Sequence, residues 1–279
     1  MSDRKSLRRR APVSPWAWRS GVLALVAVVV WAVAVFTRGG LRPGDPVGMA
    51  FGIAATVLMV VAALYAWRRR AMSLASRLRL GGARGWLQLH IYGGALFLLL
   101  VLLHSGLRWP SGLMSWSLWL LSVWTVITGS LGLLLQRTIP RVLASRPGLE
   151  VNYDRIPELV DELRQRAEAL VAEQDAALRG FYSSRLAPVL AGPRRDPLAF
   201  FGSGEDRRRL EPLAHLRTLM SAEQQSQIQT LEDLYTAKLD LDTHYTLQQA
   251  LRGWLWIHVP PSILLLAVVL AHILSVVYY

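Results

Sequence analysis

The stretch that decides the predicted fold is LQLHIYGGALFLLLVLLHSGL, residues 87–107. It is apolar and long enough to cross a bilayer, yet it carries two histidines, His90 and His104. An ionisable side chain inside a membrane helix is costly and indicates a functional site. Residues fourteen apart on a helix point within about 40° of each other and lie about 21 Å apart along its axis. Both imidazoles are therefore expected on one helix face, one near each membrane surface.

The last stretch of the chain, residues 254–279, repeats this pattern with His258 and His272, again fourteen residues apart. Two spanning helices with matched pairs can supply two bis-imidazole sites stacked across the bilayer. A neutral imidazole is a good axial ligand for iron, and haem is large and apolar enough to fill the space between two such helices. The alternative for a single membrane histidine is a hydrogen-bonded packing residue.

The repeated His-x13-His pattern resembles the ligand pattern of membrane b-type cytochromes. It is similar to the cytochrome b subunit of respiratory quinol–cytochrome c reductases and, more loosely, to the ferric reductase group. The resemblance covers residues 87–107 and 254–279, with one helix between them, and not the rest of the chain. It implies two non-covalent b-type haems and transmembrane electron transfer, with quinone or another redox protein as partner.

Composition points to a membrane protein made of helices. The chain has 279 residues, of which 53% are hydrophobic, and its apolar residues cluster in long runs. The absence of cysteine excludes disulfides, Cys-ligated iron–sulfur clusters and covalently attached haem. The formal charge is +12, but the arginines lie beside the apolar runs, where topology signals and lipid headgroup contacts are expected. We therefore expect membrane lipid as a partner and no nucleic acid.

The predicted fold is an all-α, polytopic membrane protein with five transmembrane helices. A basic tail (1–20) precedes four spans within 21–136, a soluble helical insertion (137–253) follows, and the fifth span is 254–279. The basic start and first apolar run could also describe a cleaved signal peptide. A retained helix is favoured, because the run is longer than a signal core and another span follows almost at once.

The distribution of basic residues predicts the orientation. Six lie in the tail and six in residues 68–85, against three on the other side, a ratio of twelve to three. The positive-inside rule places the N-terminus and the insertion in the cytoplasm and the C-terminus at the outer face, as in a bacterial-type cytoplasmic membrane. The third and fifth spans then run in the same direction, so His90 pairs with His258 and His104 with His272. We call these pairs the inner site and the outer site.

Several residues near the histidines are candidates for contact with haem. Gly94 and Ser262 are small and lie on the histidine faces, where a flat macrocycle could approach the backbone, although close helix packing also uses small residues. Arg84 and Arg252 could bind propionates at the inner site and Arg108 at the outer site, or serve only as topology and lipid contacts.

The rest of the chain gives weaker signals. Pro260 and Pro261 predict a kink after His258. In the insertion, helices are predicted over 157–178 and from Ser221 onward, with a loop over 180–205. Between the second and third spans, residues 71–85 could form a short amphipathic helix on the membrane surface. His215 and His244 are expected to be solvated, although His244 is also fourteen residues from His258.

Two other functions remain open from the sequence. One is a ferric or quinone reductase in its own right, although no flavin or nicotinamide module is recognisable in the insertion. The other is a metal or haem transporter that uses the four histidines. Against it, 21 Å is too long for one ion site, and the five spans contain no carboxylate.

Overall fold

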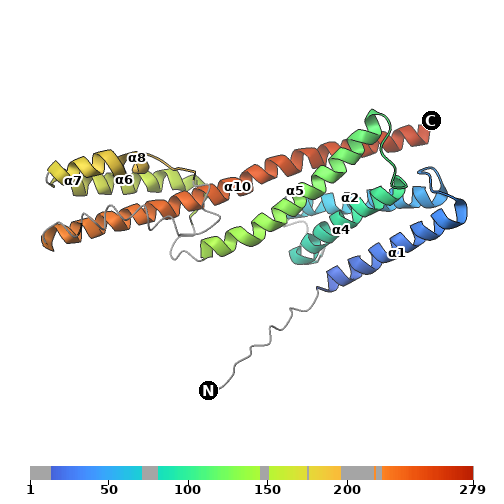
Figure 1. Cartoon of the computed structure of the whole chain (residues 1–279), viewed down its shortest axis with the longest axis horizontal. Coiled ribbons are helices and arrows are strands. Elements are labelled where there is room, and N and C mark those ends of the chain that lie inside the picture. Colours follow the sequence, from blue (N-terminus) through green and yellow to red (C-terminus); the bar gives the residue numbers. More distant parts are fainter. Residues whose placement is uncertain are drawn as a thin grey trace, which may run out of the picture. The chain divides into compact units, whose positions relative to one another are not determined.

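The structure is a computed structural model that describes residues 14–70, 81–144, 151–174, 176–195, 217 and 222–278 (Figure 1). Within these ranges the regular secondary structure is helical, without a strand, so the prediction of an all-α fold is confirmed. Residues 71–80 of the predicted surface helix, His215 and the predicted helix start at Ser221 lie outside the described residues. The remainder of that stretch, residues 81–85, is not a separate helix, because a long helix already begins at Ala83.

Five helices are long and apolar enough to cross a membrane, as predicted. They are α1 (Pro15–Arg38), α2 (Pro46–Arg70), α4 (Ala83–His104), α5 (Leu113–Ala144) and α10 (Ala222–Tyr278). Among the described residues, all exposed large hydrophobic side chains belong to residues 18–134 or 255–278, where lipid rather than water can cover them. At 57 residues α10 is about 85 Å long, so only its apolar C-terminal part can lie in a hydrocarbon layer of about 30 Å. The chain is a polytopic membrane protein.

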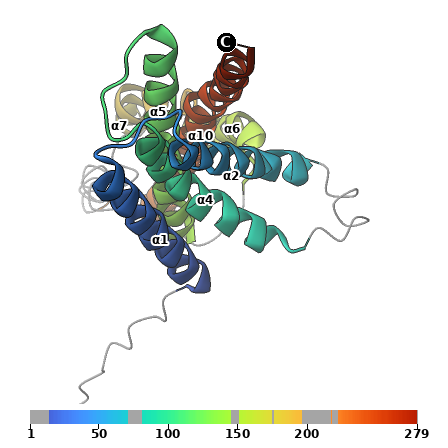
Figure 2. The ribbon, with the colours of Figure 1, turned by 90° about the vertical axis from the view of Figure 1, so that its right-hand side faces the viewer.

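The chain divides into two compact units, and α5 and α10 contribute residues to both. The bundle unit comprises Met1–Ser130 and Ile257–Tyr279, and the insertion unit comprises Leu131–Trp256. In the bundle unit, α2 and α1 both pack along α4 (Figure 2). The core between these helices and the end of α10 includes Phe51, Ala55, Phe97, Leu100 and Leu265.

The end of α4 is fixed directly after His104. Gly106 has φ +64°, a left-handed conformation that glycine adopts without steric cost. A Cβ at this position would lie 2.7 Å from the carbonyl oxygen of Leu41, in the loop between α1 and α2. Glycine therefore lets this turn lie against the neighbouring loop, two residues after His104.

The insertion unit is built from short helices that pack on α10. It contains η1 (Tyr153–Arg155), α6 (Ile156–Ala172), α7 (Ala176–Phe181), the π-helix η2 (Tyr182–Leu186) and α8 (Ala187–Leu190). The helix predicted over 157–178 is shorter in the structure, because α6 ends at Ala172. The loop predicted over 180–205 was wrong for residues 180–190, which are helical. Every fourth residue from 178 to 190 is apolar and buried, and these side chains join Ile228, Leu231 and Leu239 of α10 in one core. Burial of that stripe outweighs the helix-breaking tendency of Gly180 and Pro188.

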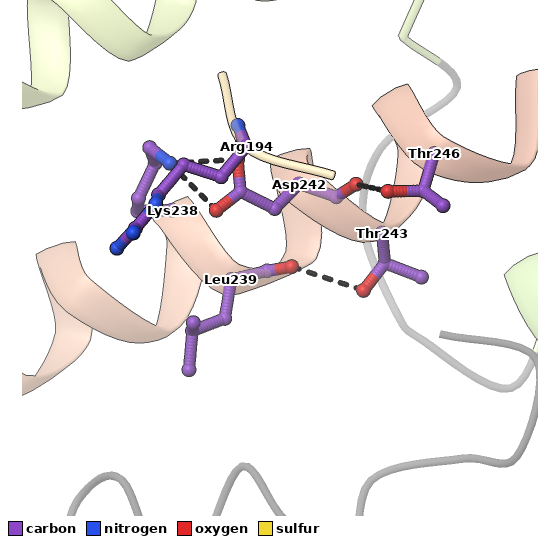
Figure 3. Close-up of polar contacts among 6 residues, drawn as sticks. All are labelled: Arg194, Lys238, Leu239, Asp242, Thr243 and Thr246. Atoms are coloured by element: carbon purple, nitrogen blue, oxygen red, sulfur yellow. Dashed lines mark hydrogen bonds and ion pairs between the residues drawn. The ribbon is translucent and has the colours of Figure 1, made fainter. Parts of the chain in front are cut away.

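A buried ion pair lies on the part of α10 in the insertion unit (Figure 3). The Nζ atom of Lys238 donates to both carboxylate oxygens of Asp242, at 2.6 Å each, and the Arg194 backbone N–H donates to Asp242 Oδ1 at 2.8 Å. The Lys238 side chain has no exposed area and that of Asp242 is 5% exposed. His244 on the next turn is also buried, so the expectation that it is solvated was wrong.

Replacement of Asp242 with Ala should destabilise the insertion unit strongly. It leaves the Lys238 ammonium buried without its carboxylate, which costs about 3 to 5 kcal/mol. The double variant Lys238→Met/Asp242→Leu removes both charges and should unfold at a higher temperature than the single variant. Thermal unfolding followed by circular dichroism and limited proteolysis measures this difference. A single variant at least as stable as the double variant would contradict the role of the buried charge.

Candidate functional site

The structure brings the four membrane histidines together in the two pairs that the topology predicts. In the inner site, the ring centroids of His90 and His258 lie 6.3 Å apart. In the outer site, those of His104 and His272 lie 6.5 Å apart. All four residues belong to the bundle unit, on α4 and on the last part of α10.

These centroid separations leave room for one metal ion between the two imidazoles of each pair. A first-row metal ion binds an imidazole nitrogen at about 2.0 to 2.1 Å, and the ring centre lies about 1.1 Å behind that nitrogen, so the two centroids stand about 6.3 Å apart. The ring planes cross at 81° in the inner site and 76° in the outer site. Two axial ligands can rotate about their common axis, so these angles are compatible with such binding.

Helix α2 orients both histidines of α4 through its backbone. The Nδ1 atom of His90 lies 3.0 Å from the carbonyl oxygen of Ala62, and that of His104 lies 2.8 Å from the carbonyl oxygen of Gly48. A carbonyl oxygen can only accept, so Nδ1 carries the proton in each ring and donates it. In a neutral ring, the lone pair is then on Nε2. Metal-binding histidines characteristically donate their other ring N–H to such an acceptor.

Helix α5 contacts His258 through Thr128 and leaves room for its ring at Gly129. Thr128 Oγ1 lies 3.0 Å from His258 Nδ1, and a Cβ at Gly129 would lie 3.4 Å from the same ring. One residue earlier on α10, the carbonyl oxygen of Ile257 accepts a hydrogen bond of 2.9 Å from Trp124 Nε1. That oxygen lacks its usual helical donor because Pro261, four residues on, has no N–H. α10 remains helical through both prolines, with Trp124 supplying the missing donor.

Small residues leave room around the rings. A Cβ at Gly52 would lie 2.9 Å from His104 Cε1 and Nδ1, so only glycine lets this ring lie against α2. No described atom lies within 4 Å of a Cβ built at Gly94, so close helix packing does not account for that glycine. Ser262 Oγ donates to the carbonyl oxygen of His258 at 2.6 Å and thus bonds to its own helix.

The three arginines expected near haem propionates occupy different surroundings. Arg84 and Arg108 are exposed, and a guanidinium nitrogen of Arg108 lies near Gly40 in the loop between α1 and α2. Arg252 forms an ion pair of 3.1 Å with Asp154 and lies 4.0 Å over the ring of Tyr153. These two partners of Arg252 belong to the insertion unit.

Each site offers two histidines and no further protein ligand among the residues that the structure describes. No group of three or more His, Cys, Asp or Glu side chains able to hold a metal ion is found in those ranges. Zinc sites use at least three protein ligands, whereas a haem iron takes four ligands from the macrocycle and needs only two axial ones. The residues present therefore fit haem.

Sequence reasoning missed the residues that orient the rings: Trp124, Thr128, Gly52 and the two α2 carbonyls. The available signal for α2 was the pair Gly48 and Gly52, a spacing that permits close helix approach. For Thr128 there was no distinguishing signal, because hydroxyls in membrane helices usually bond to their own backbone.

Comparison of the chain with known proteins found no matching family model, no matching curated protein and no matching solved structure.

Replacement of Gly52 with Ala should impair the outer site and spare the inner one. The new Cβ would force the His104 ring to move, and overpacking of this kind costs about 1 to 3 kcal/mol. We expect the haem content of the purified variant to fall from two towards one per chain. Gly21→Ala in α1 is the matched control, because a Cβ there has no described atom within 4 Å. Equal haem content in both variants would contradict the assigned geometry.

Proposed function

We propose that this chain is a transmembrane electron-transfer cytochrome with two b-type haems. His90 and His258 would hold the inner haem, and His104 and His272 would hold the outer haem. The observation that carries this proposal is the pair of centroid separations, 6.3 Å and 6.5 Å, which suit two imidazoles on one iron. The Nδ1 hydrogen bonds of three of these rings support it further.

The ligand set favours electron transfer over oxygen chemistry. The two histidines of each pair would hold a b-type haem, which would supply a reversible one-electron couple and, with both histidines bound, would offer oxygen no free position. The two sites are separated by about 21 Å along α4, so one lies near each face of the bilayer. Helix α2 orients His90 and His104, and α5 orients His258, through hydrogen bonds.

The electron donor and acceptor are proposed to be quinone and another redox protein, such as a cytochrome or an iron–sulfur protein. Oxidation of a quinol to a quinone releases two electrons and two protons, and a quinol can release its electrons one at a time. The chain is then a subunit or partner of a membrane oxidoreductase complex. The two histidine pairs would hold the groups at which an electron could enter and leave the chain.

The orientation belongs to the same proposal. The N-terminus and the insertion lie in the cytoplasm and Tyr279 at the outer face of a bacterial-type cytoplasmic membrane, because basic residues beside the spans favour that side by twelve to three. A topology reporter fused at residue 200 should be active inside the cell, and activity outside would reverse the names of the two sites.

The purified protein should be reduced by a quinol analogue and not by NADH alone. Nicotinamide gives up a hydride, which a flavin must split into single electrons before a haem can accept them. Optical spectra recorded after each addition, with a chemical reductant as the reference for full reduction, measure this difference. The variant His90→Ala/His104→Ala, with one ligand removed from each pair, is the control for non-specific reduction. Rapid reduction by NADH without flavin or partner would refute the proposed donor class.

A further inference from the structure

Thr128 is a buried hydroxyl whose proton and lone pairs have separate partners. It is 3% exposed. Its Oγ1 donates to the carbonyl oxygen of Trp124 at 2.8 Å, with that of Thr125 at 3.2 Å as the second acceptor. A hydroxyl has one proton, and the Trp124 carbonyl oxygen, which can only accept, lies nearer to it than His258 Nδ1 does, at 3.0 Å. We therefore assign the proton to that carbonyl and the acceptor role towards His258 Nδ1 to the same hydroxyl oxygen.

With this assignment the tautomer of His258 follows. Its Nδ1 carries a proton and donates it to Thr128, so the lone pair of the neutral ring is on Nε2. Such a hydrogen bond makes the imidazole a stronger electron donor towards a bound iron. A stronger donor stabilises the ferric state more than the ferrous state, which lowers the reduction potential.

The two sites differ in these contacts. In the inner site both rings donate from Nδ1, His90 to a carbonyl oxygen and His258 to Thr128. In the outer site His104 donates to a carbonyl oxygen, whereas His272 makes no ring hydrogen bond to another described residue. Two of the three acceptors are backbone carbonyl oxygens, which a substitution does not remove. The third is the Thr128 side chain, so its hydrogen bond to His258 can be removed by one substitution.

We propose that Thr128 is a positioning residue that orients His258 and lowers the reduction potential of the inner haem. This inference rests on the proposed function. The Thr128 hydroxyl makes reduction of the inner site less favourable than it would be without it. An electron is therefore more favourably placed at the outer site.

The test is an optical redox titration of the purified protein with Thr128 replaced by Val. Valine keeps the shape of the side chain and removes the acceptor. We expect the equilibrium constant for reduction at the inner site to rise by about three- to tenfold, where tenfold corresponds to about 59 mV for one electron. The outer site should not shift. Repeating the titration in the His104→Ala background, which retains the inner pair alone, identifies the inner signal.

Two further variants separate tuning from a merely structural effect. Thr128→Ser keeps the hydroxyl and should titrate like the wild type. Ser122→Ala removes another buried hydroxyl of α5, one that donates to the Leu118 carbonyl oxygen at 2.7 Å, and should leave both potentials unchanged. Loss of the inner haem in Thr128→Val but not in Thr128→Ser would also support the positioning role.

An unchanged inner potential in Thr128→Val would overturn the inference, as would an equal shift in Thr128→Ser or Ser122→Ala. These failures are distinct from a failure of the proposed function. If the wild-type protein binds no haem, the proposed function fails. If it binds two haems and Thr128→Val titrates like the wild type, only the role of Thr128 fails.

Discussion

An imidazole inside a bilayer has two ring nitrogens, and each needs a polar partner. Leaving a polar group unsatisfied in hydrocarbon costs several kcal/mol, so membrane histidines are retained where both nitrogens are used. In three of the four rings Nδ1 donates within the bundle unit: His90 and His104 to carbonyl oxygens of α2, and His258 to Thr128 of α5. A metal ion between the rings of each pair would bind one further nitrogen of each of the four rings.

The helices of the bundle unit are matched to this requirement. The carbonyl oxygens of Gly48 and Ala62 are fourteen residues apart on α2, the same spacing as His90 and His104 on α4, so two antiparallel helices meet both rings in register. Gly52 lets one ring lie against α2. Beside His258, Trp124 satisfies a carbonyl oxygen that a proline would otherwise leave without a donor.

The sequence was sufficient for the spans and the histidine pairing, because hydropathy, arginine distribution and helical periodicity depend on local composition. It was insufficient to predict the hydrogen-bond acceptors that orient the histidine rings. The acceptors on α2 are backbone atoms, which leave no residue signature, and Thr128 resembles Ser122, whose hydroxyl bonds only to its own helix. Residues 180–190 were taken for a loop because Gly180 and Pro188 obscured a short buried stripe. Burial of His244 depends on tertiary packing and could not be read from its polar neighbours.

The measurement that tests the central claim most directly is a pyridine haemochrome assay of the purified protein, with protein concentration determined independently. The proposal predicts two haem b groups per chain in the wild type and one in each of the variants His104→Ala and His258→Ala, with the remaining absorption bands differing between the two variants. A wild-type protein with no haem or with a single haem would contradict it, as would one band spectrum shared by both variants.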